Sequence, residues 1–521
     1  MKRALPCCIL AGLVALAISL AAPLSPKSSV PEFGKYTDSL VVALHYVGYL
    51  SDNNERFADQ AAKLKRRLGT APYVRVGFAA SVPIEFPAVD LNQPLTSEQM
   101  ASTLRTIDQI VQRARDNQVC VHITLTSGFF HGTNDLRRAA IKQDVRNAQW
   151  FADGWIGDPT SFAVVATSAE EVPPSAWITP SRYARPLRAR MEEGVRIVGA
   201  HLAAIMAGGA DTLITVSGDG EVELNFERNI AGGEHLVGNA PIYTDYSPFM
   251  VEEFRDWVVR RRYEGDRSPA SDDNHDGHTF NHDFETSFAT WKLRYFDSSG
   301  PIPLSAYLKM TSKLPSSGAY FIDNGFDAPR TPVPGNAFWE LWMEFRQQAI
   351  ADYVHDFATW VAIPPTRFYT HQIPADFLFG TSDSLRLRTS ASPVRTAFAF
   401  PDASTGITVF NTFDGRHHKK TGVRELYDRV SRASPDWGIF EYNPSVPIGA
   451  GGAGGRKASN DIFYYLGELQ TLNAFHPHVI VPFAWTDVSE QRDLNIQRST
   501  FEVALQRYIQ IVGKTPWRPR P

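Results

Sequence analysis

The sequence has little cysteine and no surplus of positive charge, and both absences exclude classes of protein. Cys7, Cys8 and Cys120 are the 3 cysteines in 521 residues, and the first two lie in an apolar amino-terminal stretch. If that stretch is removed, Cys120 remains alone, so no internal disulfide can form and stability must come from a large buried core. The 52 Lys and Arg residues do not outnumber the 56 Asp and Glu residues. We therefore expect no nucleic-acid partner, because phosphate binding needs concentrated positive charge.

The first 21 residues are predicted to be a signal peptide. Two basic residues precede a nearly uninterrupted apolar run, Cys7–Ala22, and the small residues Ser19 and Ala21 stand before a cleavage site. The run is at the short end of the roughly 20 residues that a membrane-spanning helix needs. We expect a secreted protein, periplasmic or extracellular, that has no membrane association after cleavage. This leaves a linker over residues 22–38 and a folded unit over residues 39–521, whose oligomeric state stays open.

Short apolar runs alternate with amphipathic segments through the folded unit. Eight runs are predicted strands, at Leu40–Tyr46, Tyr73–Phe78, Val119–Leu125, Thr212–Ser217, Arg367–His371, Gly406–Phe410, Trp437–Glu441 and Val479–Phe483. Helices are predicted over Glu55–Leu68, Ser97–Gln118 (with Ser97 as N-cap), Pro180–Met206, Pro248–Arg262, Ala337–Val361, Gly422–Ala433, Asp461–Asn473 and Phe501–Val512.

This alternation predicts an α/β fold of the (β/α)8 barrel type, a TIM barrel. Near-continuous apolar strands are typical of parallel strands buried on both faces. The alternative is a doubly wound open sheet, which needs a tight Gly-rich turn after the first strand, and His45–Gly48 is not such a turn. The chain is about twice the length of a minimal barrel, so long loops are expected after the third, fourth and seventh strands, where barrel enzymes carry their sites.

Two glutamates stand where predicted strands end. Glu221 follows the fourth strand directly after Gly220, and Glu441 ends the seventh strand. Two carboxyl groups across one barrel mouth are what glycosidic bond cleavage requires, because one protonates the leaving oxygen while the other attacks or activates water. Glu223 and Glu227 compete with Glu221, and Glu223 is the second choice.

Several segments resemble clan A glycoside hydrolases, most closely the family 42 β-galactosidase-like group. Gly220 departs from that clan, which usually has Asn before the acid/base glutamate, and the stretch Gly218–Val222 is instead similar to the acid segment of the inverting β-amylases. The segments that carry the family 42 likeness are Tyr246–Tyr263, Trp342–Arg346, Glu441–Pro444 and Phe483–Trp485.

The resemblance implies a role for each candidate site residue. Glu221 becomes the general acid/base and Glu441 the nucleophile of a retaining hydrolase that acts on a glycan or glycoside. Further residues are then expected to bind substrate: Trp485 as a platform under a sugar, Arg75 beside the nucleophile, Tyr369 and His371 lining the mouth, and Asn443. His122, inside the third strand, is expected to be structural. An inverting β-amylase-like hydrolase and a barrel that binds glycans without cleaving them remain alternatives.

One acidic loop has the spacing of a calcium site. Side-chain oxygens recur at alternate positions, Gly277 permits a sharp turn, and an acid closes the segment at position twelve, as in dockerin and EF-hand loops. We expect a structural Ca²⁺ inside the long insertion near residues 264–336, and no organic cofactor. The expected ligands are Asp272, Asn274, Asp276, His278 and Asp283.

Overall fold

The computed structural model describes a large part of the predicted folded unit. The signal peptide and linker predicted over residues 1–38 lie outside the described residues, as does the segment 264–336 apart from Ala328. The described residues are 39–47, 54–86, 93–127, 135–150, 180–208, 213–220, 222, 224, 245–263, 328, 337–373, 392–400, 403–409, 423–434, 436–444, 461–486 and 495–517.

Eight parallel strands form one sheet that curves into a nearly closed barrel. They are β1 (Leu40–Val47), β2 (Val74–Pro83), β3 (Cys120–Thr126), β4 (Ile214–Gly218), β5 (Phe368–Tyr369), β6 (Gly406–Thr408), β7 (Gly438–Tyr442) and β8 (Val479–Thr486). The order is β5-β4-β3-β2-β1-β8-β7-β6, and the edge strands β5 and β6 meet through parallel bridges Tyr369↔Ser404 and Gln372↔Ile407. The predicted (β/α)8 barrel is confirmed.

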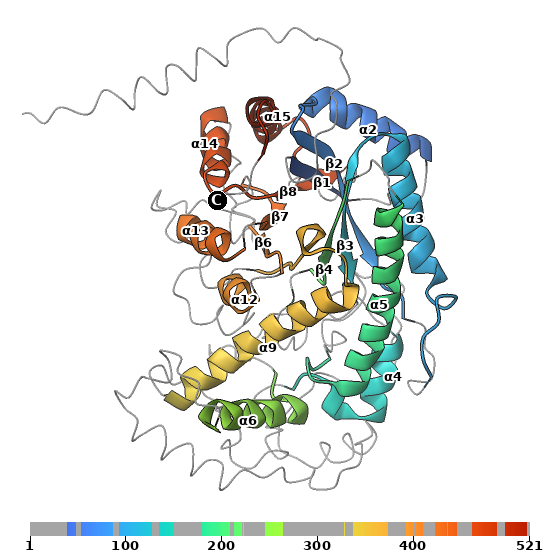
Figure 1. Cartoon of the computed structure of the whole chain (residues 1–521), viewed down its shortest axis with the longest axis vertical. Helices are drawn as coiled ribbons and strands as arrows, with labels where there is room; N and C mark the ends of the chain where they lie inside the picture. The colour runs from blue at the N-terminus through green and yellow to red at the C-terminus, as the bar shows by residue number, and fades with distance from the viewer. Residues whose placement is uncertain are drawn as a thin grey trace, which may run out of the picture.

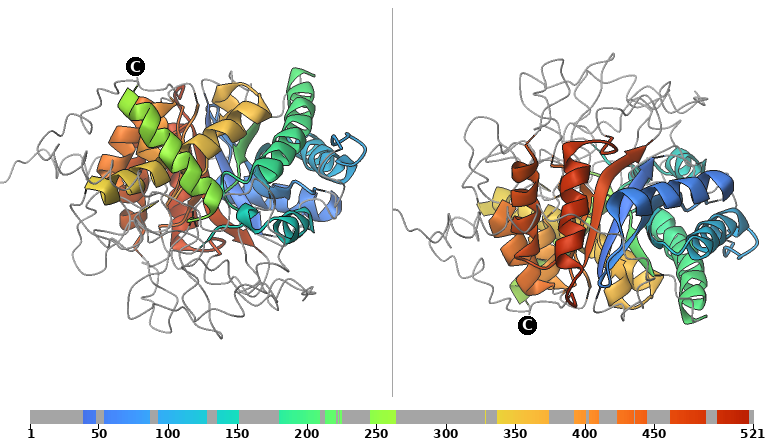
Figure 2. Two further views of the ribbon diagram at one scale, coloured as in Figure 1. Left: turned by 90° about the horizontal axis from the view of Figure 1, so that it is seen from below. Right: turned by 90° about the horizontal axis from the view of Figure 1, so that it is seen from above.

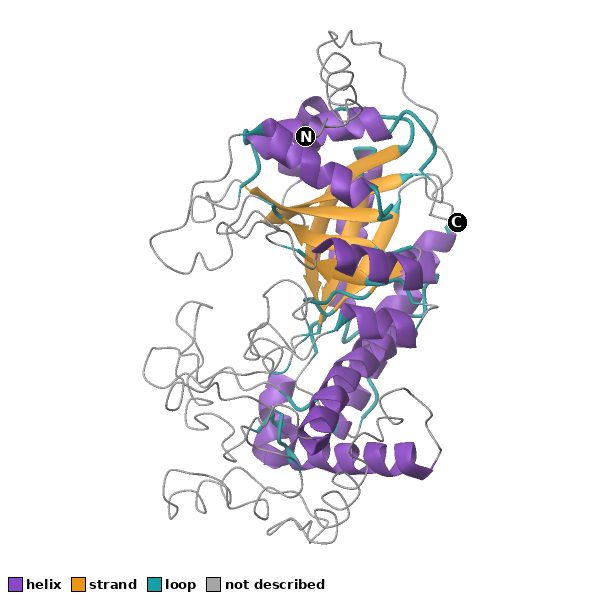
Figure 3. Ribbon diagram, turned by 90° about the vertical axis from the view of Figure 1, so that its left-hand side faces the viewer, coloured by secondary structure: helices purple, strands orange, loops and turns teal. Residues whose placement is uncertain are grey.

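Helices connect the strands and cover the outside of the sheet (Figures 1 and 3). α14 packs on α15 and α15 on α2, so the chain's last helices lie beside its first one (Figure 2). The described helices are α2 (Asn54–Leu68), α3 (Ala101–Asp116), α4 (Asp135–Gln143), η2 (Val145–Asn147), α5 (Arg185–Ala207), α6 (Pro248–Tyr263), α9 (Ala337–Val361), η6 (Pro365–Arg367), α12 (Pro393–Ala399), α13 (Val423–Ala433), α14 (Ile462–Asn473) and α15 (Thr500–Val512).

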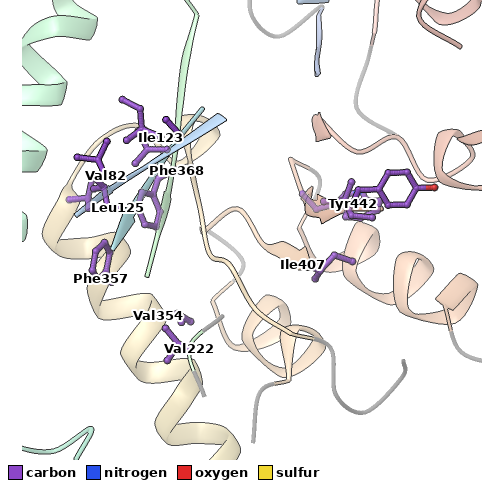
Figure 4. Close-up of a cluster of buried hydrophobic side chains, with 14 of the residues drawn as sticks. Val82, Ile123, Leu125, Val222, Val354, Phe357, Phe368, Ile407 and Tyr442 are labelled. Atoms are coloured by element: carbon purple, nitrogen blue, oxygen red, sulfur yellow. The ribbon is translucent and has the colours of Figure 1, made fainter. Parts of the chain in front are cut away.

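The strands bury apolar side chains on both faces, as their composition predicted. In β1, Leu40, Val42 and Leu44 join the cluster between sheet and helices, while Val41 and Ala43 join the smaller cluster inside the barrel. This split follows from the two-residue alternation of a strand. Figure 4 shows part of the outer cluster, where side chains of β2 and β3 lie beside Phe357 of α9 and Phe368 of β5.

Two shorter helical connections were missed, and two helix starts were predicted too early, one of them at Pro180, where α5 begins at Arg185. α4 and η2 lie in the stretch predicted as a loop after the third strand, and α12 lies between β5 and β6. Nine-residue and seven-residue helices are too short for a clear apolar period, although Ser392 before Pro393 is a helix-start signal. The predicted N-cap Ser97 is wrong, since α3 begins at Ala101. Within the described residues no helix is both long and apolar enough to cross a membrane.

Gly77→Ala is expected to destabilise the fold, and Gly467→Ala is its matched control. An added Cβ at Gly77 would lie 1.8 Å from the backbone oxygen of Cys120, which β3 cannot move without losing its pairing with β2. We expect a loss of about 3 kcal/mol or more. Gly467 is exposed within α14 and nothing lies within 4 Å of its added Cβ. Alanine there should stabilise by about 0.5–1 kcal/mol. Urea unfolding monitored by circular dichroism measures both, and equal effects of the two changes would contradict the register of β2 and β3.

Candidate active site

The carboxyl ends of the strands share one rim of the barrel. All neighbouring strands are parallel, so β4 and β7 end on the same side, and β7 lies three positions from β4 around the ring through β5 and β6. In barrels of this kind the rim at the carboxyl ends carries the functional groups.

A layer of histidine, serine and threonine side chains fills the barrel just below this rim. His122 of β3 forms hydrogen bonds with Thr215 Oγ1 at 2.9 Å through Nδ1 and with Ser217 Oγ at 3.0 Å through Nε2. Ser217 donates to Thr124 Oγ1 at 3.0 Å. On the other side, His371 Nε2 and Thr408 Oγ1 lie 2.9 Å apart. These contacts link β3 with β4, and the residues after β5 with β6, through hydroxyl and imidazole groups.

Aromatic rings separate the two halves of this layer. The Phe440 ring of β7 stacks on His122 with ring centres 4.7 Å apart and lies 5.1 Å from the His371 ring. Across the barrel, the Phe483 ring stacks on His45 of β1 at 4.8 Å. The interior near the rim therefore offers flat apolar faces next to hydrogen-bonding groups.

Burial keeps His45 and His122 uncharged. It lowers the pKa of His45 from 6.5 to about 4. The pKa of His122 is lowered well below its usual value, first by burial and then by the neighbouring His371 and His45. A neutral imidazole both donates and accepts a hydrogen bond, which fits the two hydroxyl partners of His122. The prediction that His122 is structural agrees with these contacts.

Glu441 lies where β7 loses its regular geometry. It is half-buried with a left-handed φ of 49°, and the pairing of β7 with β8 shifts register between Ile439 and Tyr442. Phe440 points into the barrel, whereas Tyr442 packs edge-on against Phe501 of α15 at 5.8 Å. In a regular strand Glu441 would share the helix-facing side of Ile439. The bulge removes that constraint, as bulges beside functional sites commonly do.

Asn443 ties the end of β7 to its two neighbours. Its side-chain amide donates to the Phe483 carbonyl of β8, and its backbone N–H donates to the Val409 carbonyl at 3.3 Å. The side chain is fully buried. Asn443 thus holds the rim around Glu441, and its expected contact with substrate stays a prediction.

The end of β4 is held on both sides. Asp219 is buried with a φ of 36°, and its carboxylate accepts from Ser127 N at 2.9 Å, Ser127 Oγ at 2.8 Å and Tyr353 OH at 2.5 Å. Gly220 lies beside His371 on the other side, since an added Cβ at Gly220 would lie 3.1 Å from His371 Nδ1. A larger residue would press on His371, which is a physical reason for glycine at this position.

The expected acid/base residues Glu221 and Glu223 lie outside the described residues. Their neighbours Val222 and Leu224 are described, and both are fully buried. Val222 belongs to the same apolar cluster as Val354 of α9 and lies near it in Figure 4. Of the predicted site residues, His371 lies at the end of β4, and Glu441 lies on the same rim of the barrel.

Three other predicted substrate contacts are corrected by their positions. Trp485 is fully buried on the helix side of β8, where its Nε1 donates to Gln60 Oε1 of α2 at 3.1 Å. Arg75 is the second residue of β2, near the amino end of the barrel and far from the rim of Glu441. Tyr369 is buried in the interior, and its hydroxyl donates to the Thr366 carbonyl at 3.3 Å, before β5 begins.

The predicted calcium ligands Asp272, Asn274, Asp276, His278 and Asp283 also lie outside the described residues. Among the residues whose placement is described, no group of three or more His, Cys, Asp or Glu side chains is arranged to hold a metal ion.

Sequence reasoning missed most of the supporting residues. The inward hydroxyls Thr215 and Ser217 alternate along β4, so two-residue periodicity could have identified them. Ser127 and Tyr353 had no such signal, because Tyr353 is 134 residues from Asp219 in sequence.

His45→Gln is expected to make the fold less sensitive to acid. Its pKa is about 4 when folded and about 6.5 when unfolded, so the unfolded state binds more protons between these values and stability falls as the pH drops through this window. The loss from this residue is on the order of 2 kcal/mol by pH 5. Glutamine stays neutral and avoids it. Urea unfolding at pH 7.5 and pH 5 measures the effect, with the pH 7.5 value as control for packing, and an equal acid-induced loss in both proteins would refute it.

Comparisons with known proteins give similarity to solved structures only. No protein-family model and no curated protein sequence matches the chain. The catalytic domain of a β-amylase from Paenibacillus polymyxa is similar with a TM-score of 0.49 and 11% identity, over 92% of this chain and 99% of that one. A β-glucosidase from Thermotoga maritima, in complexes with galacto-hydroximolactam and noeuromycin, is similar with a TM-score of 0.27 at 9% and 10% identity, over 89% of this chain and 88% of that one.

Proposed function

We propose that the chain is a secreted glycoside hydrolase in which Glu441 and Glu221 are the two catalytic carboxyl groups. The observation that carries the proposal is the position of Glu441 at the bulged end of β7, on the same rim as Gly220, which packs beside His371 at the end of β4. Because consecutive Cα atoms are about 3.8 Å apart, Glu221 follows that packed glycine closely.

The interior below the rim supports a neutral, hydroxyl-rich ligand. Its Ser and Thr hydroxyls and the neutral His122 carry no charge, so they attract neither phosphate nor carboxylate strongly. A sugar has hydroxyls that exchange hydrogen bonds with such groups, and C–H faces that pack on a partly exposed aromatic ring such as that of Phe483. Which sugar is bound depends on residues beyond those described.

In the preferred mechanism, Glu221 protonates the glycosidic oxygen while the Glu441 carboxylate attacks the anomeric carbon. The bond to the leaving group breaks and a covalent glycosyl ester of Glu441 forms. Glu221, now ionised, removes a proton from water, which displaces Glu441 and gives a product of retained configuration. In the inverting alternative, Glu441 activates water for a single displacement. Proton NMR of the first anomer released distinguishes the two mechanisms.

Glu441→Gln and Glu221→Gln are expected to abolish most hydrolysis. Glutamine keeps the size of the side chain but removes the nucleophile in one variant and the acid in the other. Loss of the acid is expected to lower kcat by about 10²–10⁴-fold, and loss of the nucleophile by at least as much. The assay is a panel of nitrophenyl glycosides and polysaccharides. Glu425→Gln, an exposed change on α13, is the matched control and should leave activity unchanged.

A different outcome of this panel would favour the non-catalytic reading. If the wild type hydrolyses no member but binds a polysaccharide, and Glu441→Gln binds it equally well, the chain is a glycan-binding barrel and the hydrolase proposal fails.

Calcium binding by the acidic loop remains a separate proposal. Ca²⁺ added to EDTA-treated protein is expected to raise Tm, because a ligand that binds only the folded state stabilises it by about 2.7 kcal/mol at 100 times Kd. Asp272→Asn combined with Asp276→Asn should remove the increase, whereas Asp256→Asn on α6 should not. Differential scanning fluorimetry with Mg²⁺ as the comparison ion tests this, and an unchanged Tm in the wild type would refute it.

A further inference from the structure

The chain leaving β4 follows one face of α9. Gly218 packs against Phe357, since an added Cβ there would lie 2.3 Å from Phe357 Cδ1. Asp219 accepts a hydrogen bond from Tyr353. Tyr353 and Phe357 lie about one turn apart on the helix. One turn of α9 therefore contacts the end of β4 and Asp219, shortly before position 221.

The Asp219 carboxylate accepts hydrogen bonds from two different residues. Tyr353 OH lies 2.5 Å from Asp219 Oδ2, and Ser127 donates to the same carboxylate through both its N–H and its hydroxyl. The Arg182 guanidinium lies 4.8 Å from the centre of the Tyr353 ring, where its charge favours the arrangement. Burial, and then the nearby Asp219, raise the pKa of Tyr353 well above its usual value, so the phenol stays protonated and donates.

Simple packing would not need this carboxylate. Burying an ionised group is costly unless it is hydrogen-bonded, and an apolar side chain would often serve stability as well. The carboxylate instead restricts the backbone conformation of Asp219. Its bonds fix Asp219 in a left-handed conformation that non-glycine residues seldom adopt, and this sets the path of the next residues. On the opposite side, His371 limits the movement of Gly220.

We propose that Tyr353 is a positioning residue for the general acid, acting through Asp219 to fix the backbone from which Glu221 extends. This inference rests on the proposed function, because it assumes that Glu221 protonates the leaving group. Tyr353 itself has no contact with the reacting atoms. A misplacement of about 1 Å costs about 10²-fold in rate for a group that must meet its substrate in one geometry.

Tyr353→Phe tests the proposal because it removes one hydroxyl and keeps the ring under Arg182. Two substrates of the sugar accepted by the wild type are compared: a phenyl glycoside, whose leaving group needs protonation, and a 2,4-dinitrophenyl glycoside, whose leaving group does not. We expect kcat/KM to fall about 10–100-fold on the phenyl glycoside. The value on the dinitrophenyl glycoside should stay within about threefold, and the acid's limb of the pH profile should shift.

Tyr369→Phe is the matched control. It also removes a buried phenol hydroxyl, but one that faces the amino end of the barrel and bonds to Thr366. It should affect both substrates equally or not at all. If Tyr353→Phe does not fold, Ser127→Ala removes another hydrogen bond to Asp219, the one from the Ser127 hydroxyl, and should give the same selective loss.

Glu221→Gln in the same assay separates the two proposals. If it loses activity selectively on the phenyl glycoside while Tyr353→Phe lowers both substrates equally or changes only Tm, the positioning role is overturned and the proposed function stands. If Glu221→Gln shows no selectivity, or the wild type cleaves neither glycoside, the assignment of the acid fails and the positioning role fails with it.

Discussion

Hydrogen bonding between the edge strands β5 and β6 holds the ring on which the candidate site depends. Gln372 N donates to the Gly406 carbonyl at 3.1 Å, and Thr408 N donates to the Gln372 carbonyl at 2.9 Å. Gly406 makes this approach possible, because a Cβ there would lie 2.0 Å from the Thr370 carbonyl oxygen. The same few residues place His371 beside Thr408. Without this closure, β4 and β7 would lie in distant parts of an open sheet, and their carboxyl ends would be far apart along its edge.

The interior of the ring changes character from one end to the other. Near the amino ends it is filled by apolar side chains such as Val41, Val479 and Val481, which stabilise the barrel. Near the carboxyl ends, His122, Ser217 and their hydroxyl partners replace them. These polar groups satisfy one another, so their burial costs little. Apolar and polar layers therefore fill different ends of one barrel.

Local departures from regular strand geometry decide which side chains reach the rim. The left-handed conformations of Asp219 and Glu441 both occur where a strand ends, and each is held by contacts from neighbouring elements. For Asp219 these come from Ser127 and α9, and around Glu441 they come from Asn443 and the backbones of β6 and β8. A rigid outer layer of helices and strands thus sets the backbone at the two points where the proposed chemistry needs it.

The sequence by itself determined the eight strands, most of the helices and the strand ends at which Glu221 and Glu441 stand, because hydrophobic periodicity and chain order are local properties. It did not determine which face each strand-end residue occupies. Regular alternation from Phe483 would place Trp485 inside the barrel, but the register of β1 with β8 shifts between His45 and Tyr46, and Trp485 faces α2 instead. Likewise, the partnership of Tyr353 with Asp219 joins positions far apart in the chain. Such facing and pairing arise only when strands take their final register and helices pack on them, and no local pattern encodes that step.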